Sequence, residues 1–403
     1  MKVLEKKYLL PFVLVTSLFA LWGLANNMTD TLLAAFRKIM QMSDTQTSFI
    51  QMAFYGAYFC LALPAALFIR KYSFKSGVIL GLSMYAAGAI LFLPAARMES
   101  YAFYLIAIYI LAAGCSVLET TANPYVMSMG APETATRRLN IAQSFNPIGS
   151  IIGILVSKYF ILRDISLYSV SGTYTALGCV LLAVMAAMLF AHMPQGRDTA
   201  APDALGATFR RLFRNRSYTF GVIAQFFYVG AQICVWSFTI RLVMKELNMV
   251  ESQAATLYLV SIIGFCLSRF VYTALMKYVS PQRLLAIGSS LSTICAVLVV
   301  PTHGWLCVIC LILVSVFMSL MFPTIYGIAL GSVENPSFGG RPGDAKIGAS
   351  GLIMAILGGA LLTPVQGMVS DAAGINLSYI VPAFCFVVVL LYSLSVKKTA
   401  SAK

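Results

Sequence analysis

Residues 101–129 read YAFYLIAIYILAAGCSVLETTANPYVMSM, and they indicate the class of fold more clearly than any other segment. Its side chains are almost all apolar or small, and Glu119 is its only charged residue. An α-helix rises ~1.5 Å per residue, so a helix of this length crosses a bilayer core of roughly 30 Å. The stretch therefore predicts a transmembrane helix that carries one buried carboxyl group.

The rest of the chain repeats this pattern of long apolar segments. Of its 403 residues, 60% are hydrophobic and 10% are charged, whereas soluble domains carry roughly 25% charged residues. A transmembrane β-barrel would instead show alternating segments of about ten residues. The sequence predicts an all-α membrane protein whose twelve transmembrane helices lie at about residues 9–36, 46–69, 77–95, 101–129, 138–162, 170–192, 217–243, 251–275, 284–300, 304–332, 346–370 and 375–395.

A polar segment divides these helices into two sets of six. We expect an N-terminal half at residues 1–192, a cytoplasmic central loop at 193–216 and a C-terminal half at 217–403. With the N-terminus in the cytoplasm, 20 of the 28 Lys and Arg residues fall in cytoplasmic segments. Arg269 lies within a helix, and the external segments carry only Arg37, Lys38, Arg97, Lys158, Arg163, Arg241 and Lys245. Because positively charged loops stay inside, both termini are predicted to be cytoplasmic.

The same pattern disfavours several other classes of protein. The net charge of +14 lies in short loops, without the accessible basic face that nucleic-acid binding needs. Nine cysteines are scattered through apolar segments, which favours packing over a metal or redox site. The chain has no G-x-x-x-x-G-K-S/T phosphate loop and no plausible Ser-His-Asp or Cys-His set. We therefore expect a secondary transporter with no enzyme activity, no catalytic residues, no cofactor and no metal.

Two carboxyl groups lie deep within the predicted helices, those of Asp30 and Glu119. A charged carboxylate inside the membrane costs at least ~2.5–3.5 kcal/mol on insertion scales. Apolar surroundings favour the protonated, neutral form of such a group. The two residues are therefore predicted to couple transport to proton binding. The alternative is a static salt bridge, for which Arg269 is the only deep basic partner.

Amide and indole side chains form stripes on the predicted helices. Trp22, Asn26 and Asp30 are spaced four residues apart and share one helix face, with Asn27 beside it. An amide offers a donor and an acceptor to sugar hydroxyls, and an indole offers a flat apolar face. The alternative is that amides join neighbouring helices and tryptophans lie at the membrane interface. The predicted substrate-binding residues are Trp22, Asn26, Asn27, Asn123, Gln143, Asn146, Gln232 and Trp236.

Several motifs resemble the bacterial fucose:proton symporter family of the major facilitator superfamily. They are LWGLANNMTD at 21–30, AFYGAYFCLALPAALFIRKYSFKSG at 53–77, LETTANPYV at 118–126, LNIAQSFNPIGSIIG at 139–153, YVGAQICVWSF at 228–238, FPTIYG at 322–327 and TPVQGMVSDAAG at 363–374. The resemblance implies the major facilitator fold and proton-coupled uptake of a monosaccharide. It also implies protonation at Asp30 and Glu119, polar sugar contacts at Asn27, Gln143 and Asn146, and aromatic walls at Trp22 and Trp236.

The chain departs from the family pattern in the second half. Phe322 precedes Pro323 where a Tyr is expected, so a hydroxyl is missing from the site and an apolar pocket is favoured. Such a pocket suits the C6 methyl group of L-fucose, which makes Phe322 a further predicted substrate-binding residue. A symporter for a glucose- or galactose-type hexose is the first alternative. A proton-driven drug exporter, which expects a cavity with fewer amides, and a membrane sugar sensor, which usually adds a signalling domain, are the others.

The expected partners are a small-molecule sugar and the lipid bilayer, with the proton as the coupling ion. The chain is predicted to be a monomer in the bacterial cytoplasmic membrane.

Overall fold

The computed structural model describes residues 4, 6–41, 44–161, 166–194, 204–336, 340, 341 and 343–401. A few side chains within these ranges, including that of Asp30, are not described. The ordered elements of the described residues are all helices, and no strand occurs among them. The predicted all-α class is therefore confirmed. The chain divides into two compact units.

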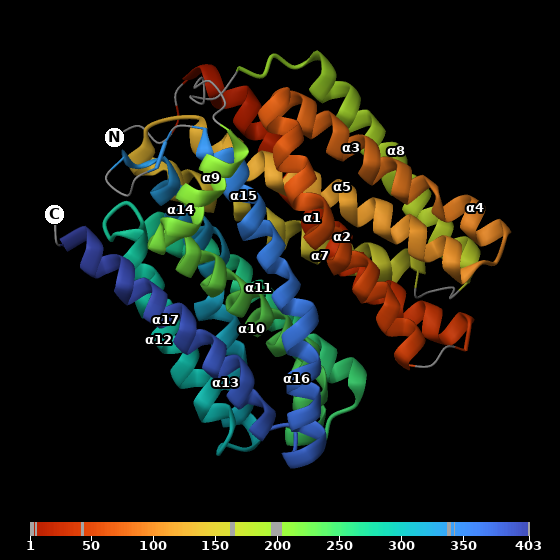
Figure 1. The fold of residues 1–403 in the computed structure, drawn as a ribbon. Coiled ribbons are helices and arrows are strands. Elements are labelled where there is room, and N and C mark those ends of the chain that lie inside the picture. Colours follow the sequence, from red (N-terminus) through yellow and green to blue (C-terminus); the bar gives the residue numbers. More distant parts are fainter. Residues whose placement is uncertain are drawn as a thin grey trace. The chain divides into compact units, whose positions relative to one another are not determined.

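The first unit comprises residues 1–132, 145–204 and 342–354. Within it α5 is central, because α2, α3 and α15 all pack against it, while α8 packs on α3 and α7 packs on α1 (Figure 1). A short π-helical turn, η3 (Ser157–Ile161), continues α7. The helices of this unit are α1 (Leu9–Ile39), α2 (Asp44–Lys71), α3 (Phe74–Ile90), α4 (Phe92–Arg97), α5 (Tyr101–Ser128), α7 (Asn146–Val156), α8 (Leu167–Phe190) and α15 (Asp344–Met354).

Small residues allow the helices of the first unit to approach one another closely. Gly149 of α7 lies so close to α1 that a Cβ atom there would collide with the carbonyl oxygen of Ala20. Gly81 of α3 faces α5 in the same way, since a Cβ atom there would lie 2.6 Å from Cγ of Leu118. Helices in lipid associate largely through such close packing, so these glycines fix the positions of α1 and α5, the two helices that carry the predicted carboxylates.

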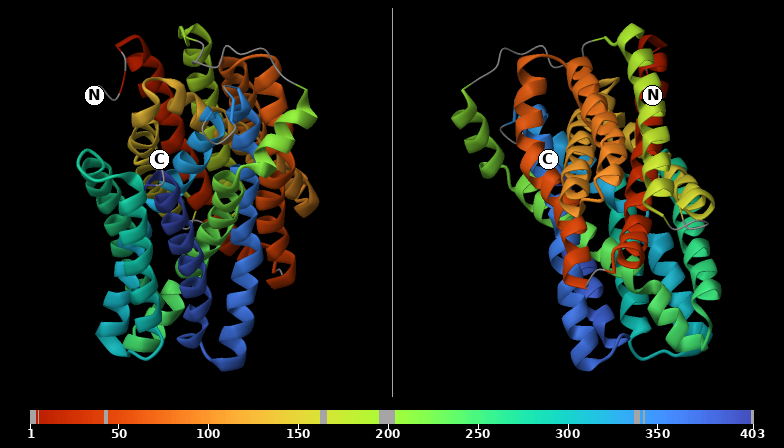
Figure 2. Two further views of the ribbon diagram at one scale, coloured as in Figure 1. Left: turned by 60° about the vertical axis from the view of Figure 1, so that its left-hand side comes forward. Right: turned by 90° about the vertical axis from the view of Figure 1, so that its right-hand side faces the viewer.

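The second unit comprises residues 133–144, 205–341 and 355–403. Its central helix is α10, which packs against α14, α16 and α17, and the long helices of the unit run roughly parallel (Figure 2). The short helix α6 packs against α14 and α11. The helices of this unit are α6 (Ala135–Gln143), α9 (Leu205–Arg214), α10 (Arg216–Leu247), α11 (Glu251–Leu275), α12 (Pro281–Val299), α13 (Gly304–Met318), α14 (Met321–Glu334), α16 (Gly358–Ala373) and α17 (Ile380–Ser401).

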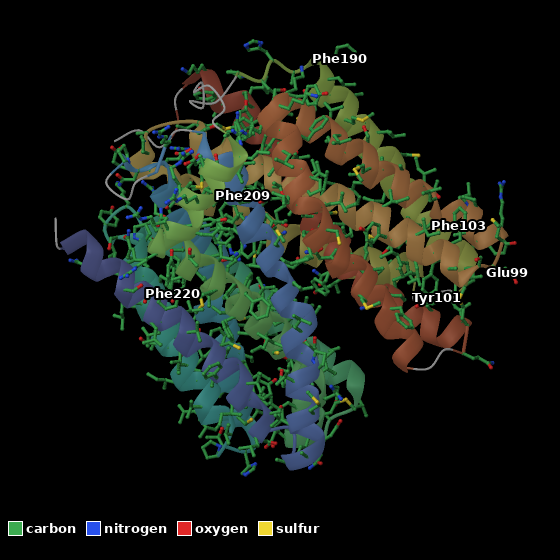
Figure 3. All side chains as sticks on the ribbon, viewed as in Figure 1. Glu99, Tyr101, Phe103, Phe190, Phe209 and Phe220 are labelled. Carbon is green, nitrogen blue, oxygen red and sulfur yellow. The ribbon has the colours of Figure 1, made fainter. Side chains whose placement is uncertain are left out.

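Twelve helical segments among the described residues are long and apolar enough to cross a membrane. This number matches the twelve spans predicted from the sequence. Large apolar side chains also lie on the outer surface, as Phe190 at the end of α8 illustrates: its side chain is 91% exposed (Figure 3). Soluble monomers rarely expose large apolar patches, so this surface is one that lipid covers.

Several of the predicted spans are interrupted in the structure, and two of these interruptions lie next to predicted sugar contacts. The span predicted at 138–162 consists of α6 and α7, separated at residues 144–145, and the span predicted at 304–332 consists of α13 and α14, separated at residues 319–320. Each break comes shortly before a proline, Pro147 or Pro323. A proline lacks an N–H donor and its ring clashes with the preceding turn, so a continuous helix is disfavoured there.

The central loop contains a helix that the sequence analysis did not predict. Residues 193–216 were expected to form a polar loop, but α9 lies within them. Thr208 and Leu212, four residues apart, are both buried, and the rings of Phe209 and Phe213 stack at 6.5 Å. This spacing of four is the signal of an amphipathic helix, and the high content of Arg in the segment concealed it.

The two compact units do not follow the two predicted halves throughout. Residues 133–144, which come from the N-terminal half of the sequence, belong to the second unit, and residues 342–354 from the C-terminal half belong to the first. The division of the sequence into two halves of six helices therefore stays a prediction, distinct from the packing units of this structure.

Candidate functional site

The carboxyl group of Glu119 lies on α5 near the centre of the first unit. Its side chain is half-buried. The Cys115 thiol, one turn earlier on α5, and the Tyr58 hydroxyl of α2 lie close enough to interact with it electrostatically. Within the described residues Glu119 makes no ion pair and no hydrogen bond. The predicted deep carboxylate therefore has no compensating partner among the described residues.

The indole of Trp22 ties α1 to α5 beside this carboxylate. Its Nε1 donates a hydrogen bond of 3.1 Å to the carbonyl oxygen of Cys115, and its ring lies 4.8 Å from that of Phe19. Only 2% of the Trp22 side chain is exposed. In this conformation Trp22 is a packing residue of the α1–α5 contact, and its predicted role as a wall of the sugar site stays a prediction.

The other predicted residues of α1 differ in their surroundings. Asn26 is exposed, whereas Asn27 is half-buried and its Nδ2 donates to the carbonyl oxygen of Gly23 at 3.2 Å. The side chain of Asp30 lies outside the described part of the chain, and its backbone belongs to α1. Asn26 is therefore the predicted sugar contact of α1 whose amide is most accessible in this structure.

Two further predicted amides lie on α5 and α7. Asn123, one turn after Glu119, is fully buried. Asn146 is half-buried at the start of α7, and its Nδ2 donates to the carbonyl oxygen of Phe19 at 3.2 Å. The first unit thus brings Asn146 and Trp22 to the contact of α1 with α5 and α7, through hydrogen bonds to the main chain of Phe19 and Cys115. Glu119 lies on α5 one turn after Cys115.

The second unit holds the remaining predicted residues along α10 and α14. Gln232 is half-buried, and Trp236 packs edge-on against Phe265 of α11 with ring centroids 5.1 Å apart. Phe322 is 9% exposed, and its ring lies 6.4 Å from that of Tyr228 and 6.3 Å from that of Tyr326. These contacts make Phe322 part of an apolar, aromatic cluster, as expected for a residue that lacks the hydroxyl of a tyrosine.

Among the described residues, some polar groups of α10 are buried without partners. Neither the oxygen nor the nitrogen of the Gln225 amide has a hydrogen-bond partner there, and the Trp236 Nε1 has none either. Buried polar groups of this kind are expected to find a partner in water or ligand. The predicted indole contact Trp236 and the amide of Gln225 therefore present unsatisfied polar groups on this helix.

Gln143 is held through its main chain. Its carbonyl oxygen accepts a hydrogen bond of 2.9 Å from Nη1 of Arg269, and its side chain is 4% exposed. The Nε of Arg269 donates to the carbonyl oxygen of Ser319 at 2.7 Å. The structure therefore answers what pairs with Arg269: main-chain oxygens at the ends of two helices, and not a carboxylate among the described residues.

Tyr58 is a neighbour of Glu119 that was not predicted from the sequence. Tyr58 belongs to the motif AFYGAYFC of α2 at residues 53–60, and two tyrosines lie three residues apart in it, at 55 and 58. Hydroxyls on an otherwise apolar transmembrane face were the available signal. The partner helix, however, follows only from the packing of α2 against α5.

Comparison with known proteins places the chain in a family. The family description Major Facilitator Superfamily matches residues 13–340. The chain is 42% identical to the L-fucose-proton symporter of Haemophilus influenzae over 97% of both chains. It is 31% identical to the glucose/galactose transporter of Brucella abortus, over 97% of this chain and 95% of that one. The crystal structure of the transporter FucP in the outward conformation covers 97% of this chain and 99% of its own at a TM-score of 0.88, with 34% identity.

The match over residues 13–340 first defines the class as a transporter of the major facilitator superfamily, and not an enzyme. The near full-length relatives then show that the chain belongs to the fucose:proton symporter family of that superfamily. The family expected from the motifs and the predicted fold class are both confirmed.

Proposed function

We propose that this chain is a proton-coupled symporter that imports a monosaccharide, with L-fucose as its substrate. The observation that carries this proposal is Glu119, a half-buried carboxyl group in the membrane-spanning helix α5 that has no ion pair among the described residues. A carboxylate in that position is unfavourable when ionised and tolerated when protonated. Its protonation can therefore be linked to a change between two conformations of the transporter.

The sugar is assigned from two lines of support. The relative named as an L-fucose-proton symporter shares 42% identity with this chain, against 31% for the relative named as a glucose/galactose transporter. Phe322 also lies in an aromatic cluster with Tyr228 and Tyr326, and such a cluster suits the methyl group that fucose carries in place of the 6-hydroxymethyl group of glucose. Uptake of a glucose- or galactose-type hexose is the second candidate.

The proposed transporter needs no cofactor, and the proton is its coupling ion. We propose that it works as a monomer in the bacterial cytoplasmic membrane, by alternating access of two six-helix halves. Both termini and the central loop are proposed to be cytoplasmic, because most of the Lys and Arg residues then lie inside.

The proposed topology predicts the location of reporter enzymes fused to truncated chains. Fusions after residues 200 and 400 should report the cytoplasm, and fusions after residues 98 and 164 should report the outside. A phosphatase that is active only outside and a fluorescent protein that is active only inside give complementary readouts. A reversed pattern at these four positions would exclude the proposed orientation.

The proposed sugar predicts an order of competition in proteoliposomes. With a panel of labelled sugars under an imposed proton or sodium gradient, L-fucose should compete best and the proton gradient should drive uptake. Phe322→Tyr should change the ratio of fucose to glucose uptake by about tenfold, the scale of a single group in an apolar pocket. Phe384→Tyr, at an exposed position of α17, is the matched control. Strong competition by glucose with none by fucose would favour the hexose alternative.

A further inference from the structure

Two membrane-spanning segments are interrupted four residues before a proline, at a residue whose carbonyl oxygen that proline leaves without its usual donor. α6 ends at Gln143, four residues before Pro147, and α13 is capped by Ser319, four residues before Pro323. In a continuous helix the N–H of residue 147 would donate to the carbonyl oxygen of Gln143, and that of residue 323 to the carbonyl oxygen of Ser319. Both later residues are prolines, which have no N–H. In apolar surroundings the freed oxygen needs a donor from elsewhere.

Arg269 of α11 supplies that donor to both oxygens. Its Nε lies 2.7 Å from the oxygen of Ser319, and its Nη1 lies 2.9 Å from the oxygen of Gln143. The side chain is 3% exposed, and its guanidinium carbon lies 4.6 Å from the ring centroid of Phe265. A guanidinium presents five donors in a rigid planar fork. One side chain can therefore bridge two carbonyl groups that belong to different helices.

Hydroxyl groups on either side of Arg269 bring α11 against the same two breaks. Ser268 Oγ lies 2.8 Å from Ser319 Oγ, and Thr273 Oγ1 lies 3.4 Å from Ser144 Oγ. All of these residues belong to the second unit. The C-terminal ends of α6 and α13 carry partial negative charge, which stabilises a cation placed there. Arg269 has no carboxylate partner among the described residues. Its buried charge is instead stabilised by the C-terminal ends of these two helices.

We propose that Arg269 is a positioning residue, which fixes the two proline breaks by bonding both freed carbonyl oxygens and so places Gln143 and Phe322 for sugar. Gln143 carries one of the bonded oxygens itself, and Phe322 follows the other by three residues and precedes Pro323. This inference rests on the proposed function, because both residues are proposed sugar contacts. Lysine is a poor substitute, since a single ammonium group cannot reproduce the fork.

The test is a mutant cycle in the full-length protein. Arg269→Gln removes the charged fork, whereas Pro147→Ala together with Pro323→Ala restores the two missing N–H groups. Pro364→Ala, inside α16 of the same unit, is the matched control for replacing a helix proline. Each variant is measured in detergent for its thermal unfolding midpoint without sugar, and in proteoliposomes for the KM and maximal rate of labelled L-fucose uptake.

We expect Arg269→Gln to lower the midpoint and to raise the KM by about tenfold, since small displacements of binding groups have effects of this order. Arg269→Lys should keep only part of the original midpoint and of the original affinity for sugar. In the Pro147→Ala, Pro323→Ala background, Arg269→Gln should lower the midpoint much less. In the Pro364→Ala background, Arg269→Gln should lower the midpoint as much as it does in the unaltered protein.

Three results would overturn the proposal. The first is that Arg269→Gln shifts the midpoint by the same amount in every background. The second is that adding Pro147→Ala and Pro323→Ala to Arg269→Gln gives no better folding than Arg269→Gln alone, and the third is that a folded Arg269→Gln protein has an unchanged KM. The midpoint is measured without sugar, so a protein that does not transport fucose at all would count against the proposed function while the cycle still tests the carbonyl bonds.

Discussion

Replacing Glu119 with glutamine should leave the protein able to exchange sugar across the membrane but unable to accumulate it. Glutamine resembles the protonated acid in shape and cannot ionise, so the variant stays in the state that is proposed to bind sugar. A proton that crosses 100 mV supplies ~2.3 kcal/mol, which corresponds to roughly fifty-fold accumulation by the unaltered protein. In Glu119→Gln the internal and external concentrations should become equal, and uptake should lose most of its dependence on pH.

The surroundings of Glu119 give the physical reason for this expectation. The side chain is half-buried on α5 and has no ion pair within the described residues. Its ionised form therefore opposes burial in a medium of low dielectric, and its protonated form does not. Asn123 lies one turn further along the same helix face, so a bound sugar can contact a side chain next to the group that takes the proton.

The measurement is a pair of assays on the same proteoliposomes. Counterflow of labelled sugar reports exchange, and uptake under an imposed proton gradient reports accumulation. Glu99→Gln is the matched control, because it makes the same chemical change at an exposed position in the turn between α4 and α5 (Figure 3). Accumulation by Glu119→Gln at the level of the control would show that this carboxyl group does not couple the proton to the sugar.

The sequence predicted the transmembrane helices well because lipid imposes a simple rule. Each span must be apolar over about twenty residues. The stretch at 101–129 satisfies that rule, and the helix found there, α5, spans Tyr101–Ser128. Interruptions within spans were harder to predict. The break between α6 and α7 is flanked by the polar residues Gln143, Ser144 and Asn146, but the mean hydropathy of the whole segment stays high enough for one span. Hydropathy alone therefore gives one helix, and only the proline marks the interruption.

The site could be predicted in part. Glu119 was predicted because a charge in an apolar helix is unfavourable, and this reason is visible in the sequence itself. The bonds of Arg269 could not be predicted, because they join its side chain to main-chain oxygens 126 and 50 residues away. Backbone acceptors carry no sequence signal. Pro147 and Pro323 each lie four residues after one of those oxygens. The importance of this spacing becomes clear only from the packing of α6, α11 and α13.

The second carboxylate should give a related but distinct result. Asp30→Asn should also abolish accumulation, with sugar binding at least partly kept. At ~1.5 Å per residue, Asp30 lies about 14 Å along α1 from Ile39, whereas Glu119 lies about 27 Å along α5 from Tyr101. Both of those helix ends are external in the proposed topology. Asp30 is therefore nearer the outside, which suits proton loading or release, whereas Glu119 suits the junction of proton and sugar.

Binding and accumulation must be measured separately for Asp30→Asn, with Glu99→Gln again as the control. Equilibrium binding of labelled L-fucose to the purified variant should persist at a fraction of the control level, because Asn26 and Asn27 on the same helix are unchanged. Uptake under a proton gradient should reach only equal concentrations on the two sides. Complete loss of binding would make Asp30 a sugar contact and not a loading site. If Asp30→Asn and Glu119→Gln each still concentrate sugar as the control does, neither carboxylate carries the coupling, and the proton must bind elsewhere in the chain.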